Sequence, residues 1–240
     1  MLMPLKALSA LLCYPTPELK AATDEIRAAL GAGGLLSAQS RSAMEPLLVE
    51  IETADVYDLQ ERFVALFDRS RTLSLNLFEH VHGESRDRGG AMVDLVETYR
   101  NAGFDPATSE LPDHLPVLLE FLAQRPLGEA MDTLEDAAHI FEALRVRLGR
   151  RESAYGAVFA ALVQLAGQAE SSETLSAMLA APDDDPDDLA ALDAVWEETE
   201  VTFGPDPNAG CPQVRDMLAT MDTPRNPPPA RPAMPATAAE

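Results

Sequence analysis

Apolar residues recur every three or four positions along most of the chain, which is the spacing of one face of an α-helix. The first such stripe consists of Leu5, Leu8, Leu11 and Leu12. Lys6 interrupts this run, and Leu12 stands where an export signal would need a small residue before Cys13. The pattern therefore predicts an amphipathic first helix and not a signal sequence.

Further stripes of the same kind predict helices over residues 17–30, 37–53, 55–68, 88–104, 127–148 and 153–168. Another helix begins near Asp113, which we expect to cap it, with Pro116 in the first turn, where no amide donor is needed. The segment 153–168 is apolar on most sides, so we expect it to be central. The segment 88–104 has a predicted inward face made of Met92, Leu95, Val96 and Tyr99.

After residue 171 the pattern weakens into a short helix, an acidic loop and a further helix over about 189–200. Composition agrees with an all-α fold, because 46% of the 240 residues are hydrophobic but only 5% are aromatic. Residues 222–240 include six prolines and predict a disordered tail. No apolar run approaches the roughly 18 residues of a membrane span.

The charge balance is strongly acidic, with 40 Asp and Glu against 18 Lys and Arg and a net charge of -22. Such a surface repels nucleic acid and anionic membranes, so we expect neither as a partner and expect a basic partner instead. No Lys or Arg occurs between Glu152 and Val214, a span that contains the acidic run 183–188. This run is either a solvated loop or a device that steers a positively charged peptide.

The two cysteines, Cys13 and Cys211, lie far apart and have no metal-ligand or redox spacing, which fits a reducing cytoplasm. No P-loop or dinucleotide-binding glycine pattern is present. Ser74 and Ser85 lie in no nucleophile motif, so nucleophilic catalysis is disfavoured.

The densest polar cluster runs from Glu79 to Arg88 and contains two histidines, three acids and two arginines. A metal site would use His80, His82, Glu84 and Asp87. On a helix, His80 and Glu84 share a face, but the two histidines point to different sides. Glu84 with Arg88, and Asp87 with a nearby arginine, would form simple ion pairs. Metal binding, acid/base chemistry and a hydrogen-bonded docking element all remain open, and we favour the last.

The other two histidines have ordinary explanations. His139 follows Glu135 by four residues, which predicts an ion pair on one helix flank. His114 is placed in the first turn of a helix, where a cation is unfavourable, so we expect a neutral ring that makes hydrogen bonds.

Two segments resemble the NarJ family of nitrate reductase assembly chaperones, within the wider TorD-like group of molybdoenzyme chaperones. They are LQERFVALFDRSRTLSLNLFEHVHGESRDRGGAMVDLVETYRNAGF, residues 59–104, and ELPDHLPVLLEFLA, residues 110–123. The string FEHVHGESRDRG is typical of the family. ELPDHLP is similar to the E-x-P-D-H signature of the wider group, here Glu110, Pro112, Asp113 and His114.

This resemblance implies a single-domain helical bundle of the TorD/NarJ-like type over residues 1–205, followed by a proline-rich tail over 206–240. It implies a cytoplasmic chaperone that is not an enzyme, carries no cofactor of its own and has no stable membrane association. Its partner would be the catalytic (alpha) subunit of respiratory nitrate reductase, bound at an N-terminal twin-arginine-like segment. The chaperone would keep this apo subunit competent for molybdenum cofactor insertion before membrane attachment.

The residues expected to bind the client or support the binding site are Phe78, Glu79, His80, His82, Glu84, Arg86, Asp87, Glu110, Asp113 and His114. Arg86 and Asp87 would serve only the fold if they formed a buried pair. Two alternatives stay open: a metal-dependent hydrolase or lyase at the His80, His82, Glu84 and Asp87 cluster, and a plain protein-interaction module.

Overall fold

The computed structural model describes residues 1–82, 86–167 and 173–183. These residues belong to one compact unit, which spans Met1–Leu189. The secondary structure within the described ranges is helical, and its one β-type contact is an isolated antiparallel bridge between Asn76 and His114. The prediction of an all-α fold is therefore confirmed.

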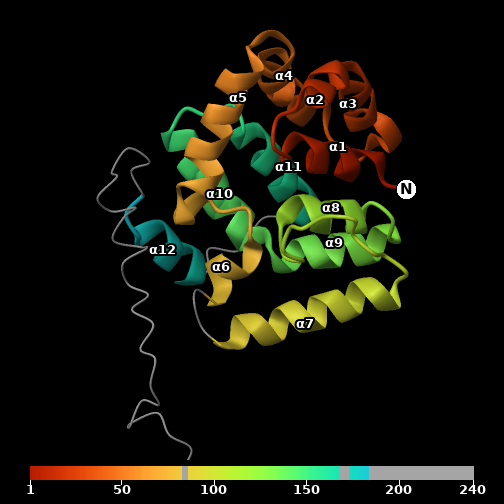
Figure 1. The fold of residues 1–240 in the computed structure, drawn as a ribbon, viewed down its shortest axis with the longest axis vertical. Coiled ribbons are helices and arrows are strands. Elements are labelled where there is room, and N and C mark those ends of the chain that lie inside the picture. The colour runs from red at the N-terminus through yellow and green to blue at the C-terminus, as the bar shows by residue number, and fades with distance from the viewer. Residues whose placement is uncertain (83–85, 168–172, 184–240) are drawn as a thin grey trace, which may run out of the picture. The chain divides into compact units, whose positions relative to one another are not determined.

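The first half of the chain contains α1 (Met3–Leu11), α2 (Pro17–Ala21), α3 (Thr23–Leu30), η1 (Ala32–Gly34), α4 (Ala38–Thr53), α5 (Val56–Phe63), η2 (Val64–Asp68), η3 (Arg71–Leu73) and α6 (Leu77–His82). The second half contains α7 (Arg86–Asn101), α8 (Leu115–Leu122), α9 (Leu127–Asp136), α10 (Ala138–Arg150), α11 (Gly156–Ala166) and α12 (Glu173–Ala180). In Figure 1, α1 packs on α3 and α8, and α11 packs on α4, α9 and α10. The predicted central position of α11 is confirmed.

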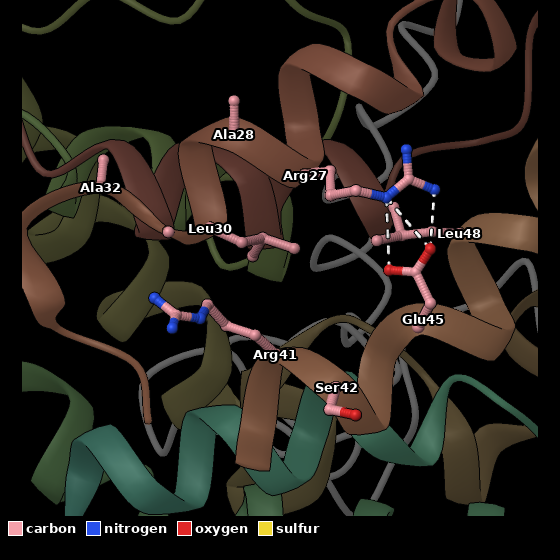
Figure 2. A pocket seen from close by; sticks show the side chains of 9 residues that line it. Arg27, Ala28, Leu30, Ala32, Arg41, Ser42, Glu45 and Leu48 are labelled. Carbon is pink, nitrogen blue, oxygen red and sulfur yellow. Dashed lines mark hydrogen bonds and ion pairs between the residues drawn. The ribbon is translucent and has the colours of Figure 1, made fainter. Parts of the chain in front are cut away.

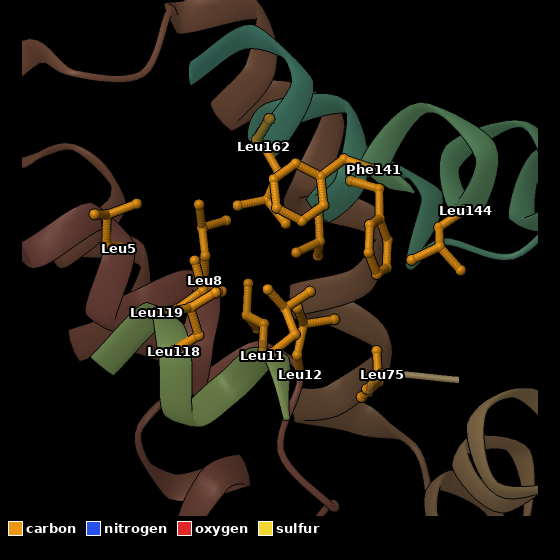
Figure 3. Packing of buried hydrophobic residues seen from close by; sticks show 14 of the residues in the cluster. Leu5, Leu8, Leu11, Leu12, Leu75, Leu118, Leu119, Phe141, Leu144 and Leu162 are labelled. Atoms are coloured by element: carbon orange, nitrogen blue, oxygen red, sulfur yellow. The ribbon is translucent and has the colours of Figure 1, made fainter. Parts of the chain in front are cut away.

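The core joins helices that are far apart in the sequence. The α1 stripe is fully buried, as its spacing predicts. In Figure 3 these leucines share one interior with Leu118 and Leu119 of α8, Phe141 of α10 and Leu162 of α11. Removing a buried leucine side chain from water stabilises the fold by about 1.5–3 kcal/mol, so this contact between α1 and α8 ties the N-terminal helix to the later ones.

Two predicted helices are each divided in the structure. The segment 17–30 breaks at Ala22, with φ -91° and ψ 3°, and the segment 127–148 breaks at Ala137, with φ -94° and ψ 1°. A ψ near zero turns the next peptide out of α-helical geometry, where ψ is near about -42°. The single long helices were therefore wrong, and Glu135 and His139 lie on two different helices instead of forming a pair on one flank.

The predicted inward face of α7 is also only partly correct. Tyr99 is 1% exposed, and Leu95 packs against the core from the edge. Met92 and Val96 are only half-buried, and Val93 is 58% exposed. In Figure 1, α7 lies at the edge of the described helices, so an apolar part of its surface is not covered by the described chain.

Arg147 of α10 is a buried residue, 3% exposed, that holds α12 in place. Its guanidinium donates to the backbone carbonyls of Thr72 and Met178, the first at 2.9 Å, and pairs with Asp183 at 3.1 Å. Asp183 also pairs with Arg150 at 3.1 Å. One buried guanidinium thus links α10, η3 and the end of α12.

Several predictions lie outside the described residues: Glu84, the acidic run beyond residue 183, the helix over 189–200, the proline-rich tail and the boundary at 205. Among the helices that are described, none is long and apolar enough to cross a membrane.

Candidate functional site

The two segments that carry the family-like motifs are joined by their backbones. The N–H of Leu77 donates to the carbonyl of Asp113 at 3.1 Å, and the N–H of Leu115 donates to the carbonyl of Leu75 at 2.9 Å. Together with the bridge between Asn76 and His114, these bonds pair the start of α6 with the start of α8. The structure thus brings the FEHVH and PDHLP motifs together.

Asp113 caps α6 and not the helix that follows it. Its Oδ2 accepts the backbone N–H of Phe78 at 2.9 Å, and its carbonyl accepts that of Leu77. Asp113 therefore satisfies two of the four N–H groups that a helix start leaves without partners. The predicted role as cap of α8 was wrong, because His114 is the residue at the N-cap of α8 and makes no side-chain capping bond.

The buried environment of Asp113 shifts its ionisation. The side chain is 1% exposed, and Oδ1 has no hydrogen-bond partner in the described part of the chain. Burial raises the pKa of this carboxyl group, while the hydrogen bond from Phe78 and the positive charge of Arg88 act in the opposite direction. The capping carboxylate is thus held in a low-dielectric setting where its charge is costly.

His80 is fixed by a hydrogen bond to the loop before its own helix. Its Nε2 lies 2.8 Å from the carbonyl oxygen of Ser74, and since a carbonyl only accepts, Nε2 carries the proton. Burial lowers the pKa of His80. The ring is therefore a neutral donor that holds the Ser74–Asn76 turn against α6.

Glu79 pairs with Arg88 across the start of α7. The Glu79 Oε1 lies 3.0 Å from a terminal nitrogen of Arg88, and both side chains are more than two-thirds buried. The described chain thus pairs Arg88 with Glu79, where the sequence spacing had indicated Glu84. Asp87 is exposed on α7, so it is not a buried partner of Arg86, and the side chain of Arg86 lies outside what the structure describes.

Phe78 and His82 form the outer part of α6. Their rings meet edge to face, with centroids 5.7 Å apart. Between them Val81 is 54% exposed. Within the described part of the chain these side chains, unlike Glu79 and His80, make no hydrogen bond that holds the fold, so they are candidates for contact with another molecule.

The remaining predicted residues gather at the other end of the pairing. Glu110 is exposed. Burial and, after it, the charge of Glu110 raise the pKa of Asp68, and the same charge opposes the effect of burial on His114. Burial lowers the pKa of His114, in agreement with the expected neutral ring. Its Nδ1, however, has no hydrogen-bond partner in the described ranges, so the expected hydrogen-bonding role is not seen at this atom.

The described side chains of the polar cluster, from Glu79 to Arg88, make separate contacts. In the described ranges, no three His, Cys, Asp or Glu side chains are grouped so that they could hold a metal ion. His80 is already bonded to Ser74, His82 is in contact with Phe78, and Asp87 is exposed. The described members of the cluster thus make separate contacts, and Glu84, the fourth ligand of the predicted metal site, lies outside the described residues.

One flank of α7 combines exposed apolar side chains with a glycine. At 100° per residue, Gly89 shares this side of the helix with Met92, Val93 and Val96, and we call these four residues the α7 flank. A Cβ added at Gly89 would meet nothing within 4 Å. Glycine inside a helix costs about 1 kcal/mol relative to alanine, and the described chain gives no steric reason for it here.

Sequence reasoning missed Arg147 and the pairing of residues 75–77 with 113–115. Arg147 could have been found, because it lies on the same helical face as Leu144 and Leu148 and a charge on an apolar stripe indicates a buried partner. The backbone pairing had no such signal, since main-chain hydrogen bonds leave no side-chain pattern.

These features define an all-helical protein whose polar motifs build a scaffold beside an exposed apolar helix flank, which is the arrangement of a binding protein. A family model described as nitrate reductase delta subunit matches residues 16–161. The chain belongs to this nitrate reductase delta subunit family.

Individual relatives agree with this assignment. The chain is 45% identical over 204 residues to the nitrate reductase molybdenum cofactor assembly chaperone NarJ of Escherichia coli (strain K12), covering 84% of this chain and 85% of that protein. It is 46% identical over 158 residues to the probable chaperone NarW of the same strain, covering 66% and 68%. It is 34% identical over 152 residues to the probable chaperone NarJ of Bacillus subtilis (strain 168), covering 62% and 80%.

Proposed function

We propose that this protein is a non-catalytic assembly chaperone of the cytoplasm that binds the apo catalytic subunit of a nitrate reductase. The observation that carries this proposal is the 45% identity, over most of both chains, to a protein named as a nitrate reductase molybdenum cofactor assembly chaperone. The chaperone keeps its client competent for molybdenum cofactor insertion.

The N-terminal twin-arginine-like segment of the client is the part that the chaperone recognises. A net charge of -22 attracts a basic peptide and speeds its association. An amphipathic peptide of this kind docks its apolar face on exposed apolar residues of a helical surface.

The α7 flank is the contact surface for this peptide. Val93 is 58% exposed, and Met92 and Val96 beside it are half-buried, so a partner would remove apolar surface from water here. Gly89 permits the backbone of a partner to approach closely. Asp94 and Glu97 are exposed on the same helix and provide carboxylates for the basic residues of the peptide.

The polar motifs have two roles in this proposal. Asp113 joins the starts of α6 and α8, His80 holds the Ser74 turn to α6, and Glu79 ties α6 to α7, so these residues support the surface without contacting the peptide. Phe78 and His82 extend the contact surface along α6, next to the exposed Val81. Glu84 and Arg86 are proposed to bind the client peptide or to support its binding site, from the motif alone.

Titration of the purified chain with a labelled N-terminal peptide of the catalytic subunit tests the proposal. Saturable binding that weakens with added salt is the expected result, because exposed charges are screened beyond a Debye length of about 8 Å at physiological salt. A peptide with both arginines replaced by glutamine should bind more weakly. Absence of saturable binding at both low and physiological salt would contradict the peptide-recognition mechanism.

A second measurement tests the chaperone role separately. The full-length apo catalytic subunit should co-purify with this chain, and the complex should dissociate once the molybdenum cofactor has been inserted. A chain that binds the mature enzyme as tightly as the apo subunit would be a plain interaction module instead.

A further inference from the structure

A pocket of about 520 Å³ lies between the C-terminal end of α3 and the first half of α4, away from the motifs described above. Figure 2 shows it from close by, with Ala28, Leu30 and Ala32 on the α3 side and Arg41 and Ser42 on the α4 side. Its volume falls within the range of about 300–1,000 Å³ that is usual for small-molecule sites. The two arginines that line it, Arg27 and Arg41, differ in whether they are already paired with acidic side chains.

Arg27 is paired with three acidic side chains. Its Nε donates to both carboxylate oxygens of Glu45, at 3.1 and 3.2 Å, and its terminal nitrogens pair with Asp24 and Glu52. Figure 2 shows the pair of Arg27 and Glu45 at one end of the pocket. The carboxylate of Glu45 is therefore turned toward Arg27 and away from Arg41.

Arg41 lies at the other end and has no such partner. No residue of the described ranges makes an ion pair or hydrogen bond with its side chain, although it is partly buried. Its NH1 atom lies 3.7 Å from the position that a Cβ on Gly31 would take. Arg69 and Arg100 also have no side-chain partner there, but both are exposed.

The end of α3 explains why the guanidinium of Arg41 lies where it does, and this interaction does not use up its N–H donors. The carbonyl end of α3 favours a cation, which holds the guanidinium near Gly31. A guanidinium has five N–H donors in a planar fork, and this fork matches the oxygens of a carboxylate or phosphate. In a chain with 40 acidic residues, a partly buried arginine without a carboxylate is a place where an external oxyanion gains a charge-assisted hydrogen bond.

We propose that this pocket binds a small organic oxyanion, a phosphate ester or carboxylate that carries a compact apolar group. The oxyanion accepts from the guanidinium of Arg41. The apolar group lies against Ala28 and Ala32. Gly31 keeps the space beside the guanidinium open, because a side chain there would stand within contact distance of NH1.

Calorimetric titration of the full chain with inorganic phosphate, phenyl phosphate and benzoate tests this site. We expect phenyl phosphate to bind more tightly than inorganic phosphate, because only the ester uses the apolar wall. Comparison of phenyl phosphate with benzoate identifies which oxyanion the site prefers. If none of the three binds saturably at concentrations up to about 10 mM, the proposal is wrong.

Three variants assign the binding to this pocket. Arg41→Gln should weaken binding about 10- to 100-fold, the usual range for loss of a charge-assisted bidentate contact. Ala28→Leu, on an exposed helical position, should fill the cavity and weaken phenyl phosphate more than inorganic phosphate. Arg100→Gln, which removes an equal charge elsewhere, should leave binding unchanged.

Thermal unfolding of each variant separates binding from folding. Arg41→Gln should remain folded, and its unfolding temperature should no longer rise on addition of phenyl phosphate, whereas that of the parent should. If Arg41→Gln lowers stability yet binds phenyl phosphate as well as the parent, Arg41 serves only the end of α3 and the proposal is overturned.

Discussion

The carboxylate of Asp113 accepts the backbone N–H of Phe78 at 2.9 Å, across 35 positions of the chain. Asp113→Ala removes this cap from α6 and should lower the free energy of unfolding by about 1–2 kcal/mol, the usual cost of losing a capping side chain. Asp113→Asn keeps an acceptor oxygen and should lie closer to the parent. Urea unfolding followed by circular dichroism measures both, and equal stability of all three proteins would exclude the capping role.

Stability should fall as the pH drops below the ordinary pKa of histidine, 6.5. Burial lowers the pKa of His80 and of His114, so the unfolded chain binds more protons than the folded one in this range. Their contribution is complete above pH 6.5 and is lost as the pH falls toward the lowered folded-state pKa values. Each histidine contributes a slope of at most about 1.4 kcal/mol per pH unit.

His80→Gln isolates one of these contributions. Glutamine can still donate to the Ser74 carbonyl but does not titrate, so the variant should lose less stability between about pH 7.5 and pH 5.5 than the parent does. Urea midpoints at the two pH values provide the comparison. The pKa values of Asp113 and Asp68 are raised in the folded chain, so these two carboxyl groups increase stability as the pH falls through their own titration range. This effect is the same in the parent and in the His80→Gln variant. Identical slopes would show that His80 does not contribute.

Gly89→Ala should change stability and peptide binding in opposite directions. The new methyl group meets nothing within 4 Å in the described chain, so the variant should gain up to about 1 kcal/mol of stability. A peptide on the α7 flank would meet that methyl group, and its affinity should fall several-fold. Gly149→Ala is the matched control, because a Cβ there also meets nothing within 4 Å and Gly149 lies on α10, outside the α7 flank, so it should gain stability without loss of binding.

Val93→Ser tests the same flank without altering the backbone. Val93 is 58% exposed, so the folded chain should lose less than about 0.5 kcal/mol. A docked peptide would lose an apolar contact of about 1–1.5 kcal/mol, or roughly tenfold in affinity. Fluorescence anisotropy with the labelled client peptide measures this change. Val49→Ser, on an exposed position of α4, is the control and should leave affinity unchanged.

Arg147→Met should be the most destabilising of these changes. It leaves the carbonyls of Thr72 and Met178 without their donor, at a cost of about 1–3 kcal/mol for each unsatisfied acceptor, while Asp183 keeps its pair with Arg150. Hydrogen exchange should show the loss first in α12. Arg145→Gln removes a more exposed pair with Glu142 and should cost less than about 1 kcal/mol.

Much of the fold could be predicted from apolar spacing, but the breaks could not. Across Ala137, the buried residues Leu134, Ala138 and Phe141 keep an unbroken helical period, so the pattern gives no sign that the chain turns there. The inward face of α7 was only partly correct for a related reason. Periodicity shows that a helix has an apolar side, but not whether the same chain covers it.

The candidate site was predictable in its residues but not in its connections. The motifs gave Asp113 and His80, yet spacing suggested that Asp113 caps the next helix, whereas it caps one that starts 36 positions earlier. A capping bond depends on which helix start comes near, and that is decided by the packing of α6 and α8. Local patterns hold no information about such long-range neighbours.

The backbone pairing of residues 75–77 with 113–115 closes a loop that contains all of α7. Both ends of this loop are fastened at one place, and α7 buries only Tyr99 fully among its described side chains, so we expect α7 to open before the rest of the described core. Such a partial opening has a lower free energy than global unfolding. Hydrogen exchange should therefore be faster in α7 than in α8, which buries most of its side chains.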